Sequence, residues 1–497
     1  CMQVDSCPGS SELPTDTPSS FSSMLKEFSS SFVTKLEPNM RVRGAPMKIV
    51  LKENFTPHKV FKARPIPFHL YGKAKALYWE YIQAGVITEL LPGESTLFLS
   101  AAMFIAKPGR LDSDGLPKLR LVTDLKGLNS AIQRTAPFPF LTSTQVWRML
   151  SPDSKIHVRL DLISSYHQVP LERESSYLTS FICCFGRARF NSGSMGLLTT
   201  SDEFVARIHH ILRDAPCLVS VDDILVSGRD WTQLEHRTRA TLQACKAGNI
   251  HLGKSKIQIG RSVEFGGLII KGAQAFPHPE KTDTIKSWPV PASVTETRGF
   301  LGLCSQLAPW CLKLTNILLP IRGLIKKDTT FMWLPDHQSA FEEAKRILCS
   351  DLVISAFDPT KESIVITDAC VTGIGFVLLQ EHPAVARIKG AAATTPGQEE
   401  TPGQCEPATT PPSSSSSSAA LGPPRQAKDA DPGTSEELPT AVRSKGVSRR
   451  LIWAGSRALT PAEANYPPLI LEAVAISLAL KKLEFYLRYG PNFKLMT

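Results

Sequence analysis

Three aspartates stand where apolar runs of the sequence end. Asp161 closes the run HVRLD, and Asp222 and Asp223 separate the apolar stretches CLVSV and ILVSG. A carboxylate at the end of a buried strand is unfavourable without a partner, and neighbouring carboxylates repel each other. Hard oxygen ligands of this kind suit Mg²⁺, and two such ions about 4 Å apart can drive phosphoryl transfer. Taken singly, each motif is also typical of a solvated turn or a cap.

The surrounding residues predict how these aspartates are positioned. KIHVRLDL is typical of a buried strand, and CLVSVDDILVSG is typical of a hairpin with the acidic pair at its tip. A strand end and a neighbouring hairpin tip can converge, so the three carboxylates are expected to meet.

A second acidic pair lies near the end of the sequence. SIVITDACVTGIGFVLLQ predicts two strands joined by a glycine-containing turn, with Asp368 inside the first. Glu472 lies on the apolar face of a predicted helix, among Ile470, Leu471, Val474 and Ala475. A glutamate on such a face either binds something or reaches solvent through its flexible side chain.

Composition limits the class of protein. The 497 residues carry a net charge of +10, which is consistent with a polyanionic partner. The 11 cysteines form no C-x-x-C pair and indicate reduced thiols. The sequence has no apolar run of about 18 residues and no signal-peptide pattern. We therefore expect an intracellular protein that makes no membrane contact.

Two segments have the composition of disordered chain. Residues 1–44 are rich in Ser and Pro, and residues 383–449 contain TTPGQEETPGQ and PPSSSSSS. The second segment interrupts the predicted strands of the C-terminal region. A long loop between two strands adds closure entropy only slowly with length, so this region can fold around it.

Several motifs in order resemble one family. RLVTDLKGLN, LDLISSYHQV, TSFICCFG, VDDILV, VEFGGLII and TRGFLGL occur at the spacing found in gypsy-like LTR retrotransposons. The chain resembles the reverse transcriptase and ribonuclease H region of their pol polyprotein, here as a fragment. The resemblance implies an α+β right-hand polymerase (fingers, palm, thumb) followed by a truncated α/β ribonuclease H-like domain. It implies fingers and palm over 45–272, a thumb over 273–328, a connection over 329–362 and the ribonuclease H-like domain over 363–497.

The resemblance also assigns roles to residues. It implies that Asp161, Asp222, Asp223, Asp368 and Glu472 are catalytic metal ligands, with two Mg²⁺ ions (or Mn²⁺) in the palm. The implied contacts of the incoming dNTP are Lys107, Arg120, Tyr166, Met195 and Gly196, and those of the primer grip are Phe265, Gly266 and Gly267. The third ribonuclease H ligand is expected directly after FKLMT, where this sequence stops, so little cleavage is expected.

The implied reaction is templated addition of dNTPs to a DNA primer on an RNA template, with RNA–DNA hybrid as a further partner. Cytoplasmic particles and the nucleus are both possible locations, and other pol domains are expected in the intact polyprotein. The sequence departs from the family at Ser220, where an aromatic residue is usual. It also departs at Asp202 and Glu203, which are expected to place charge near the primer–template path. Two alternatives therefore stay open: an inactive remnant that binds nucleic acid, and a co-opted interaction protein.

Overall fold

The computed structural model describes residues 14–111, 114–134, 137–139, 142–311, 314–326, 329–350, 353–370, 373–383, 447–488 and 492–497. Two compact units divide the chain, one comprising 1–380 and 450–497 and the other 381–449. Of the second unit, only residues 381–383 and 447–449 are described. Among the described residues, no helix is both long and apolar enough to cross a membrane.

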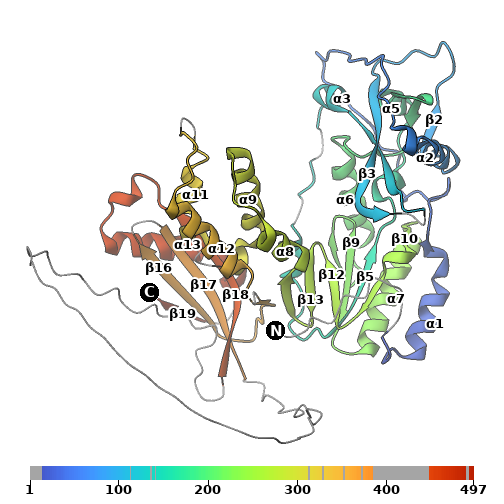
Figure 1. Ribbon diagram of the computed structural model, residues 1–497. Coiled ribbons are helices and arrows are strands. Elements are labelled where there is room, and N and C mark those ends of the chain that lie inside the picture. The colour runs from blue at the N-terminus through green and yellow to red at the C-terminus, as the bar shows by residue number, and fades with distance from the viewer. Residues whose placement is uncertain are drawn as a thin grey trace, which may run out of the picture. The chain divides into compact units, whose positions relative to one another are not determined.

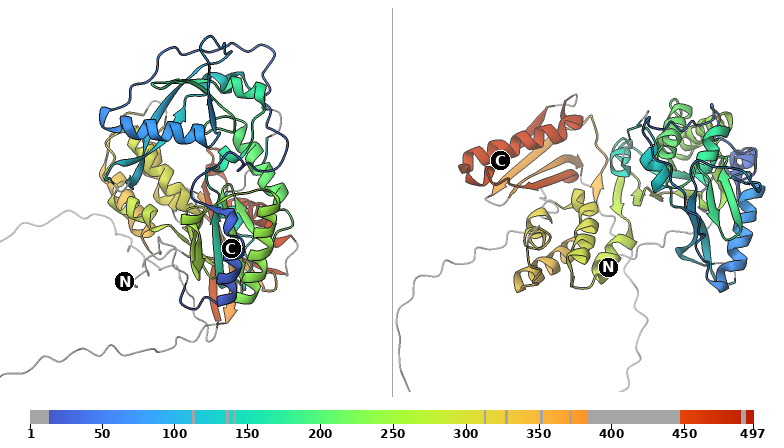
Figure 2. Two further views of the ribbon diagram at one scale, coloured as in Figure 1. Left: turned by 90° about the vertical axis from the view of Figure 1, so that its right-hand side faces the viewer. Right: turned by 90° about the horizontal axis from the view of Figure 1, so that it is seen from above.

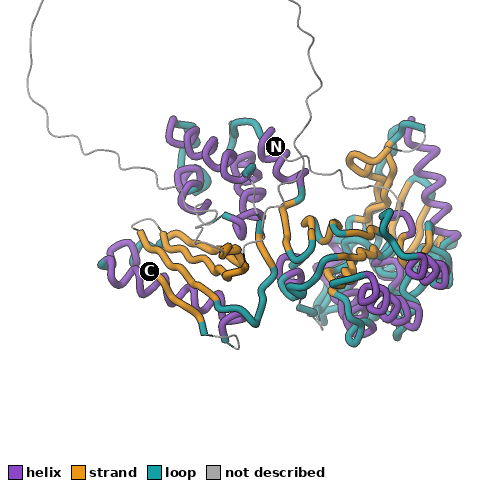
Figure 3. Tube along the Cα trace, turned by 90° about the horizontal axis from the view of Figure 1, so that it is seen from below, coloured by secondary structure: helices purple, strands orange, loops and turns teal. Residues whose placement is uncertain are grey.

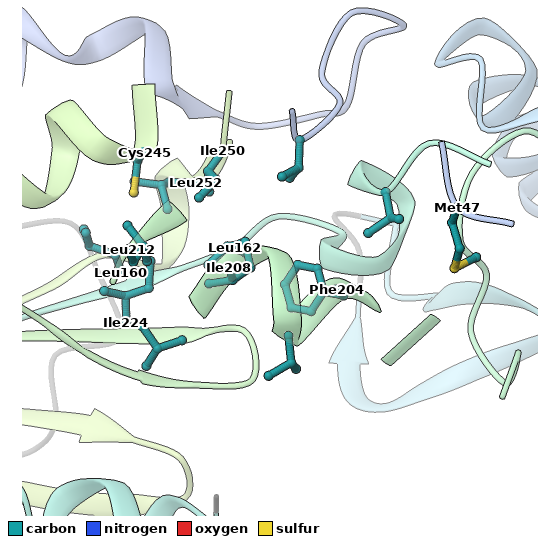
Figure 4. Close-up of a cluster of buried hydrophobic side chains, with 14 of the residues drawn as sticks. Met47, Leu160, Leu162, Phe204, Ile208, Leu212, Ile224, Cys245, Ile250 and Leu252 are labelled. Atoms are coloured by element: carbon teal, nitrogen blue, oxygen red, sulfur yellow. The ribbon is translucent and has the colours of Figure 1, made fainter. Parts of the chain in front are cut away.

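A four-stranded antiparallel sheet carries the first acidic cluster. Its order is β11 (Gln258–Gly260), β5 (Ile156–Asp161), β9 (Asp223–Gly228) and β8 (Leu218–Ser220). Helices α6 (Thr200–Ile211) and α7 (Trp231–Ala247) add their apolar side chains to the same core. Figure 4 shows Leu160 of the sheet next to Leu212, which caps the end of α6, and Ile208 of α6 next to Leu162. Helix α7 begins after Asp230 because that side chain accepts a hydrogen bond from the Gln233 backbone N–H at 2.8 Å.

Part of the predicted disordered tail is folded. Helix α1 (Ser19–Glu27) lies beside α7 (Figure 1), and β1 (Phe32–Val33) pairs with β10 (Leu252–Gly253). Phe21 and Met24 are buried in the core, and the Phe21 ring meets Trp231 of α7 at 5.5 Å between centroids. The prediction of a disordered tail over 1–44 is therefore wrong for residues 14–44, because their few apolar side chains find a partner helix. Residues 1–13 lie outside the described residues.

A five-stranded sheet forms most of the predicted fingers. Its order is β2 (Ile87–Glu89), β7 (Gly186–Phe190), β6 (Phe181–Cys183), β3 (Ser100–Leu111) and β4 (Pro117–Thr123). Helix α2 (Tyr71–Gln83) packs on it through Ala74 and Tyr78, which have no exposed surface. Short helices α3 (Lys126–Ala131), α4 (Ser143–Trp147) and α5 (Arg173–Leu178) complete the described part of this half of the chain.

A third sheet joins the predicted palm to the predicted thumb and connection. It has the order β12 (Ser262–Phe265), β13 (Leu268–Lys271), β14 (Gln274–Pro277) and β15 (Ile354–Ser355). Helices follow over the range predicted as thumb: α8 (Pro279–Ser287), α9 (Val294–Leu307), α10 (Leu314–Ile317) and α11 (Leu319–Gly323). Helix α12 (Pro335–Leu348) lies in the range predicted as connection. One apolar cluster holds these helices together, with Phe300 and Phe341 in ring contact at 4.7 Å.

The C-terminal sheet has the order β18 (Val447–Ala458), β17 (Gly373–Pro383), β16 (Ser363–Cys370) and β19 (Phe493–Met496). Helix α13 (Pro468–Leu487) lies along one face of it (Figure 2), and the C-terminus lies at its edge strand (Figure 3). Strand β17 ends at Pro383 and strand β18 begins at Val447. The predicted insertion of 383–449 is therefore too wide by one residue at its start and by three residues at its end. Residues 384–446 lie outside the described residues.

Candidate active site of the central sheet

The strand register brings the predicted carboxylates together. Strands β5 and β9 pair antiparallel, and Asp161 is the direct partner of Asp223. Asp222 follows Val221, whose φ of 55° makes the tight turn after β8, and its carbonyl accepts a hydrogen bond from the Leu162 N–H at 3.0 Å. The three aspartates therefore occupy one end of two neighbouring strands, as the sequence predicted.

Two basic side chains hold two of these aspartates. Arg159 donates from Nη2 and Nε to Asp223 Oδ1 at 2.6 and 2.9 Å, and from Nη2 to Asp161 Oδ1 at 3.4 Å. Lys256 donates to Asp161 Oδ2 at 2.8 Å. The backbone N–H of Gly266 donates to Asp223 Oδ2 at 3.2 Å. Every carboxylate oxygen of Asp161 and Asp223 thus has a donor.

Asp222 differs from its neighbours in its electrostatic environment. Burial raises the pKa of Asp222, and the charges of Asp223 and Asp161 raise it further. Burial also raises the pKa of Asp223, although Arg159 and the Gly266 N–H oppose that shift. Within the described residues, the Asp222 carboxylate has no side-chain hydrogen bond. Ionised Asp222 is therefore the carboxylate of this cluster that most lacks a compensating positive charge.

The predicted nucleotide contacts near this cluster are packed against α6 and α3. Tyr166 accepts a hydrogen bond from Ser201 Oγ at 3.2 Å, and its ring meets Phe204 edge-on at 5.7 Å. The Gly196 carbonyl accepts from Asn129 Nδ2 at 2.7 Å, which fixes the loop that exposes Met195. These contacts explain how Tyr166, Met195 and Gly196 are held in place. They do not test the predicted contact of these residues with the incoming dNTP.

The predicted triphosphate contacts lie on a different sheet. Lys107 is on β3 and Arg120 is on β4, where Arg120 pairs with Ile105 in the antiparallel register. Arg120 is exposed and Lys107 is half-buried. The two cations are thus close in register on one hairpin of the five-stranded sheet.

The predicted primer grip is the turn between β12 and β13. Phe265 is fully buried and pairs with Leu268, while Gly266 and Gly267 form the turn with φ of 55° and 74°. A side chain at Gly266 would meet Ser143 Oγ at 2.0 Å. The turn therefore requires glycine, and its hydrogen bond to Asp223 ties it to the acidic cluster.

The second acidic pair lies on β16 and α13, which pack against each other. Asp368 is exposed and pairs with Gly375 of β17. Glu472 is half-buried, and its Oε2 is a buried atom without a hydrogen-bond partner. An unpartnered buried carboxylate oxygen favours the metal-binding interpretation of Glu472 over a solvent-exposed one.

Comparisons with known proteins find similar sequences and similar folds. Two models of the RNase H-like domain found in reverse transcriptase match residues 333–401 and 439–497. The chain is 28% identical over 315 residues to the Transposon Tf2-3 polyprotein of Schizosaccharomyces pombe, which covers 63% of this chain and 23% of the relative. The Tf2-7 polyprotein is 27% identical over 315 residues, with the same coverage. The chain spans about a quarter of the length of these relatives.

Solved structures of similar fold include two foamy viral protease–reverse transcriptases. One, in complex with RNA/DNA hybrid, is 15% identical with a TM-score of 0.70 and covers 96% of this chain and 54% of that one. The other, in complex with double-stranded DNA, is 16% identical with a TM-score of 0.73 and covers 97% and 72%. The chain is similar to the reverse transcriptase and ribonuclease H region of LTR-retrotransposon pol polyproteins. The predicted fold class, a polymerase followed by a ribonuclease H-like domain, is confirmed.

The three aspartates at the ends of β5 and β9 are the kind of donor that a divalent metal needs. In the described part of the chain, no group of three His, Cys, Asp or Glu side chains is arranged to hold an ion. Arg159 and Lys256 engage two of the carboxylates. The chemistry still fits, since all three ligands are carboxylates and Asp222 has a raised pKa that a bound cation would offset.

The departures from the family pattern are accommodated locally. Ser220 is buried, and its hydroxyl lies 3.1 Å from that of Ser143. Asp202 is buried and accepts two hydrogen bonds from Arg134, both at 2.7 Å, and this pairing lowers the pKa of Asp202. Glu203 forms an ion pair with Arg207 at 2.6 Å. Both expected charges are thus neutralised by arginines.

The range predicted as fingers contains a basic pocket that the sequence did not single out. It encloses about 510 Å³ and is lined by His58, Lys62, Arg64 and Lys126, among others. Asp124, at 3.8 Å from Arg64, is the acidic residue in its lining. Phe61 and Phe68 of the same segment are exposed at 78% and 97% of their surface. Basic side chains interleaved with exposed aromatics are typical of surfaces that bind single-stranded nucleic acid.

Sequence reasoning also missed Arg159 and Lys256. Arg159 precedes Asp161 by two positions, so it lies on the same face of β5, and the strand period could have revealed it. Lys256 comes from η4 (Lys254–Lys256), far along the chain. No local spacing predicts that contact.

Proposed function

We propose that this chain is an RNA-directed DNA polymerase that adds dNTPs to a DNA primer by two-metal catalysis. The observation that carries the proposal is the register that pairs Asp161 with Asp223, beside Asp222. These three carboxylates would hold two Mg²⁺ ions, with Mn²⁺ as a substitute. Such ions supply charge stabilisation at the phosphorus and lower the pKa of the primer hydroxyl.

The other residues would bind and orient the substrates. Lys107 and Arg120, on one hairpin, would bind the triphosphate, for which paired cations are suited. Tyr166 would close on the sugar, and Met195 and Gly196 would lie beneath the new base pair. Phe265, Gly266 and Gly267 would position the primer end. The Gly266 N–H to Asp223 contact supports this, because it couples the primer-grip turn to the acidic cluster.

The partners follow from the same chemistry. An RNA template, a DNA primer and an RNA–DNA hybrid are polyanions, and the chain has a net charge of +10. The basic pocket of the fingers would take the single-stranded template. Asp368 and Glu472 would be metal ligands of a linked ribonuclease H-like domain that cleaves the hybrid.

The test is primer extension on an oligo-rA template with dTTP and Mg²⁺. We expect the wild-type chain to extend the primer and Asp222→Asn to lose extension by a factor of about 10³ or more. Matched folding of the two proteins should be checked by circular dichroism. Extension that survives Asp222→Asn would remove these carboxylates from the mechanism.

A second candidate is a remnant that binds nucleic acid without catalysis. The observation that favours it is the neutralisation of Asp161 and Asp223 by Arg159 and Lys256, which makes a palm without metal self-consistent. Binding of primer–template by a folded chain that extends no primer would establish this candidate. A co-opted interaction protein would show neither property.

A further inference from the structure

Two basic side chains engage the acidic cluster in different ways. Arg159 leaves β5 two residues before Asp161, and its side chain is only 13% exposed while it bridges Asp161 and Asp223. Lys256 ends the short turn η4 and is 44% exposed, with Asp161 as its partner. Arg159 is thus enclosed by the sheet, whereas Lys256 reaches in from the surface.

A divalent ion and Lys256 need the same oxygen. Mg²⁺ binds carboxylate oxygens at about 2.0–2.1 Å, and the Lys256 ammonium lies 2.8 Å from Asp161 Oδ2. The other oxygen of Asp161 faces Arg159 at 3.4 Å. An ion that approaches Asp161 therefore meets a positive charge on each side, and at least one must leave.

The flexible side chain is the one that can leave. Lysine is a compact point charge on a long flexible stem, whereas arginine is held by several hydrogen bonds in a fixed plane. Lys256 makes one hydrogen bond to the cluster, and its ammonium can return to water. Arg159 makes three, and removing it from a site 13% exposed would leave buried Asp223 unpaired.

We propose that Lys256 is an exchangeable cation that occupies the metal-binding oxygen of Asp161 in the metal-free palm. Arg159 is the positioning residue that stays and keeps Asp223 oriented. Metal binding then exchanges one cation for another, and Lys256 lowers the metal affinity of the free protein. This inference rests on the proposed metal-dependent function of the palm.

The test measures binding of Mn²⁺ alone, by the electron paramagnetic resonance signal of the free ion, without nucleic acid or dNTP. Lys256→Gln should bind Mn²⁺ about threefold to tenfold more tightly than the wild type, because the competing charge is gone. Lys256→Met should give the same result. Lys254→Gln is the matched control, since Lys254 is exposed on the same turn and forms no described contact with the cluster. It should change the affinity by less than about twofold.

Tighter binding by both Lys256 variants, but not by Lys254→Gln, supports the exchange. Equal or weaker binding by Lys256→Gln would overturn it, as would equal tightening by the Lys254 control. Primer extension separates this failure from failure of the proposed function. Normal extension with unchanged Mn²⁺ affinity removes only the exchange, whereas no extension and no Mn²⁺ binding in any variant removes both.

Discussion

At the scale of single residues, the three aspartates of the predicted palm differ because their neighbours differ. Asp161 and Asp223 are held by Arg159, Lys256 and a backbone N–H. In the described residues no side chain donates to the Asp222 carboxylate, and burial and two negative neighbours raise its pKa although its own backbone N–H and Lys256 oppose the shift. The ionised form of Asp222 therefore destabilises the folded protein, and a bound cation would offset that destabilisation.

Asp222→Asn should stabilise the metal-free protein at neutral pH. A carboxyl whose pKa is raised by folding stabilises below its unfolded value and loses that contribution as the pH rises through the folded value. The neutral amide removes this loss. With a chelator at pH 7, we expect the melting temperature to rise by about 2–4 °C.

The advantage of Asp222→Asn should shrink as the pH falls and disappear only below the ordinary aspartate pKa of about 3.9, where the carboxyl is protonated in both states. Mg²⁺ should raise the melting temperature of the wild type but not of the variant. Asp214→Asn is the control, since Asp214 is exposed on the same part of the chain. A variant less stable than the wild type at pH 7 would contradict the assignment.

At the scale of elements, the turn between β12 and β13, which is the predicted primer grip, contacts the acidic cluster. Gly266 combines a φ of 55°, a hydrogen bond from its N–H to Asp223 and close contact with Ser143. Ser143 in turn lies beside Ser220 at the end of β8. A change in this turn therefore reaches both strands that carry the acidic pair.

Gly266→Ala should be more damaging than Gly272→Ala. Both glycines have φ near 55°, so both variants lose about 1 kcal/mol to the left-handed backbone. Only the Gly266 side chain would meet an atom too closely, Ser143 Oγ at 2.0 Å, whereas the nearest atom at Gly272 is 3.6 Å away. We expect Gly266→Ala to lose about 1–3 kcal/mol more, measured by urea unfolding. Equal losses would show that Ser143 moves freely.

The sequence predicts an element well when the local pattern of residues determines it. It does not predict a contact whose partner lies far away along the chain. The hairpin around Asp222 and Asp223 follows from two apolar runs. Helix α1 was missed because Phe21 and Met24 become apolar core only against α7, some two hundred residues later. Lys256 was missed for the same reason, since its partner Asp161 is 95 positions away.

At the scale of the whole molecule, two buried histidines predict acid sensitivity. Burial lowers the pKa of His157 and of His167 to about 4. The unfolded chain therefore binds more protons than the folded protein between about pH 6.5 and pH 4. The stability of the fold decreases as the pH is lowered through that window. Each histidine should remove about 2 kcal/mol between pH 7 and pH 5.

His167→Gln should lessen this loss by one histidine's share. Glutamine keeps a donor for the Gly193 carbonyl, which His167 contacts through Nδ1 at 2.9 Å. Hydrogen exchange of strand β5 at both pH values, corrected for the intrinsic rate, measures the difference. Exposed His210, replaced in the same way, is the control. An unchanged pH dependence in His167→Gln would show that the neutral ring does not limit stability.

The charge of the molecule predicts how it binds nucleic acid. Each phosphate neutralised by a Lys or Arg adds about 0.7–0.9 to the slope of log affinity against log salt. Lys62 and Lys126 line the basic pocket of the fingers, so the double change Lys62→Gln, Lys126→Gln should lower that slope by about 1–2 on a template with a single-stranded overhang. On a blunt duplex the slope should stay unchanged, because the overhang is the strand assigned to the pocket.

Lys246→Gln, on the exposed side of α7, is the control variant, because it removes a similar charge outside the pocket. An equal drop in slope with that control, or with the blunt duplex, would mean that overall charge and not the pocket governs binding.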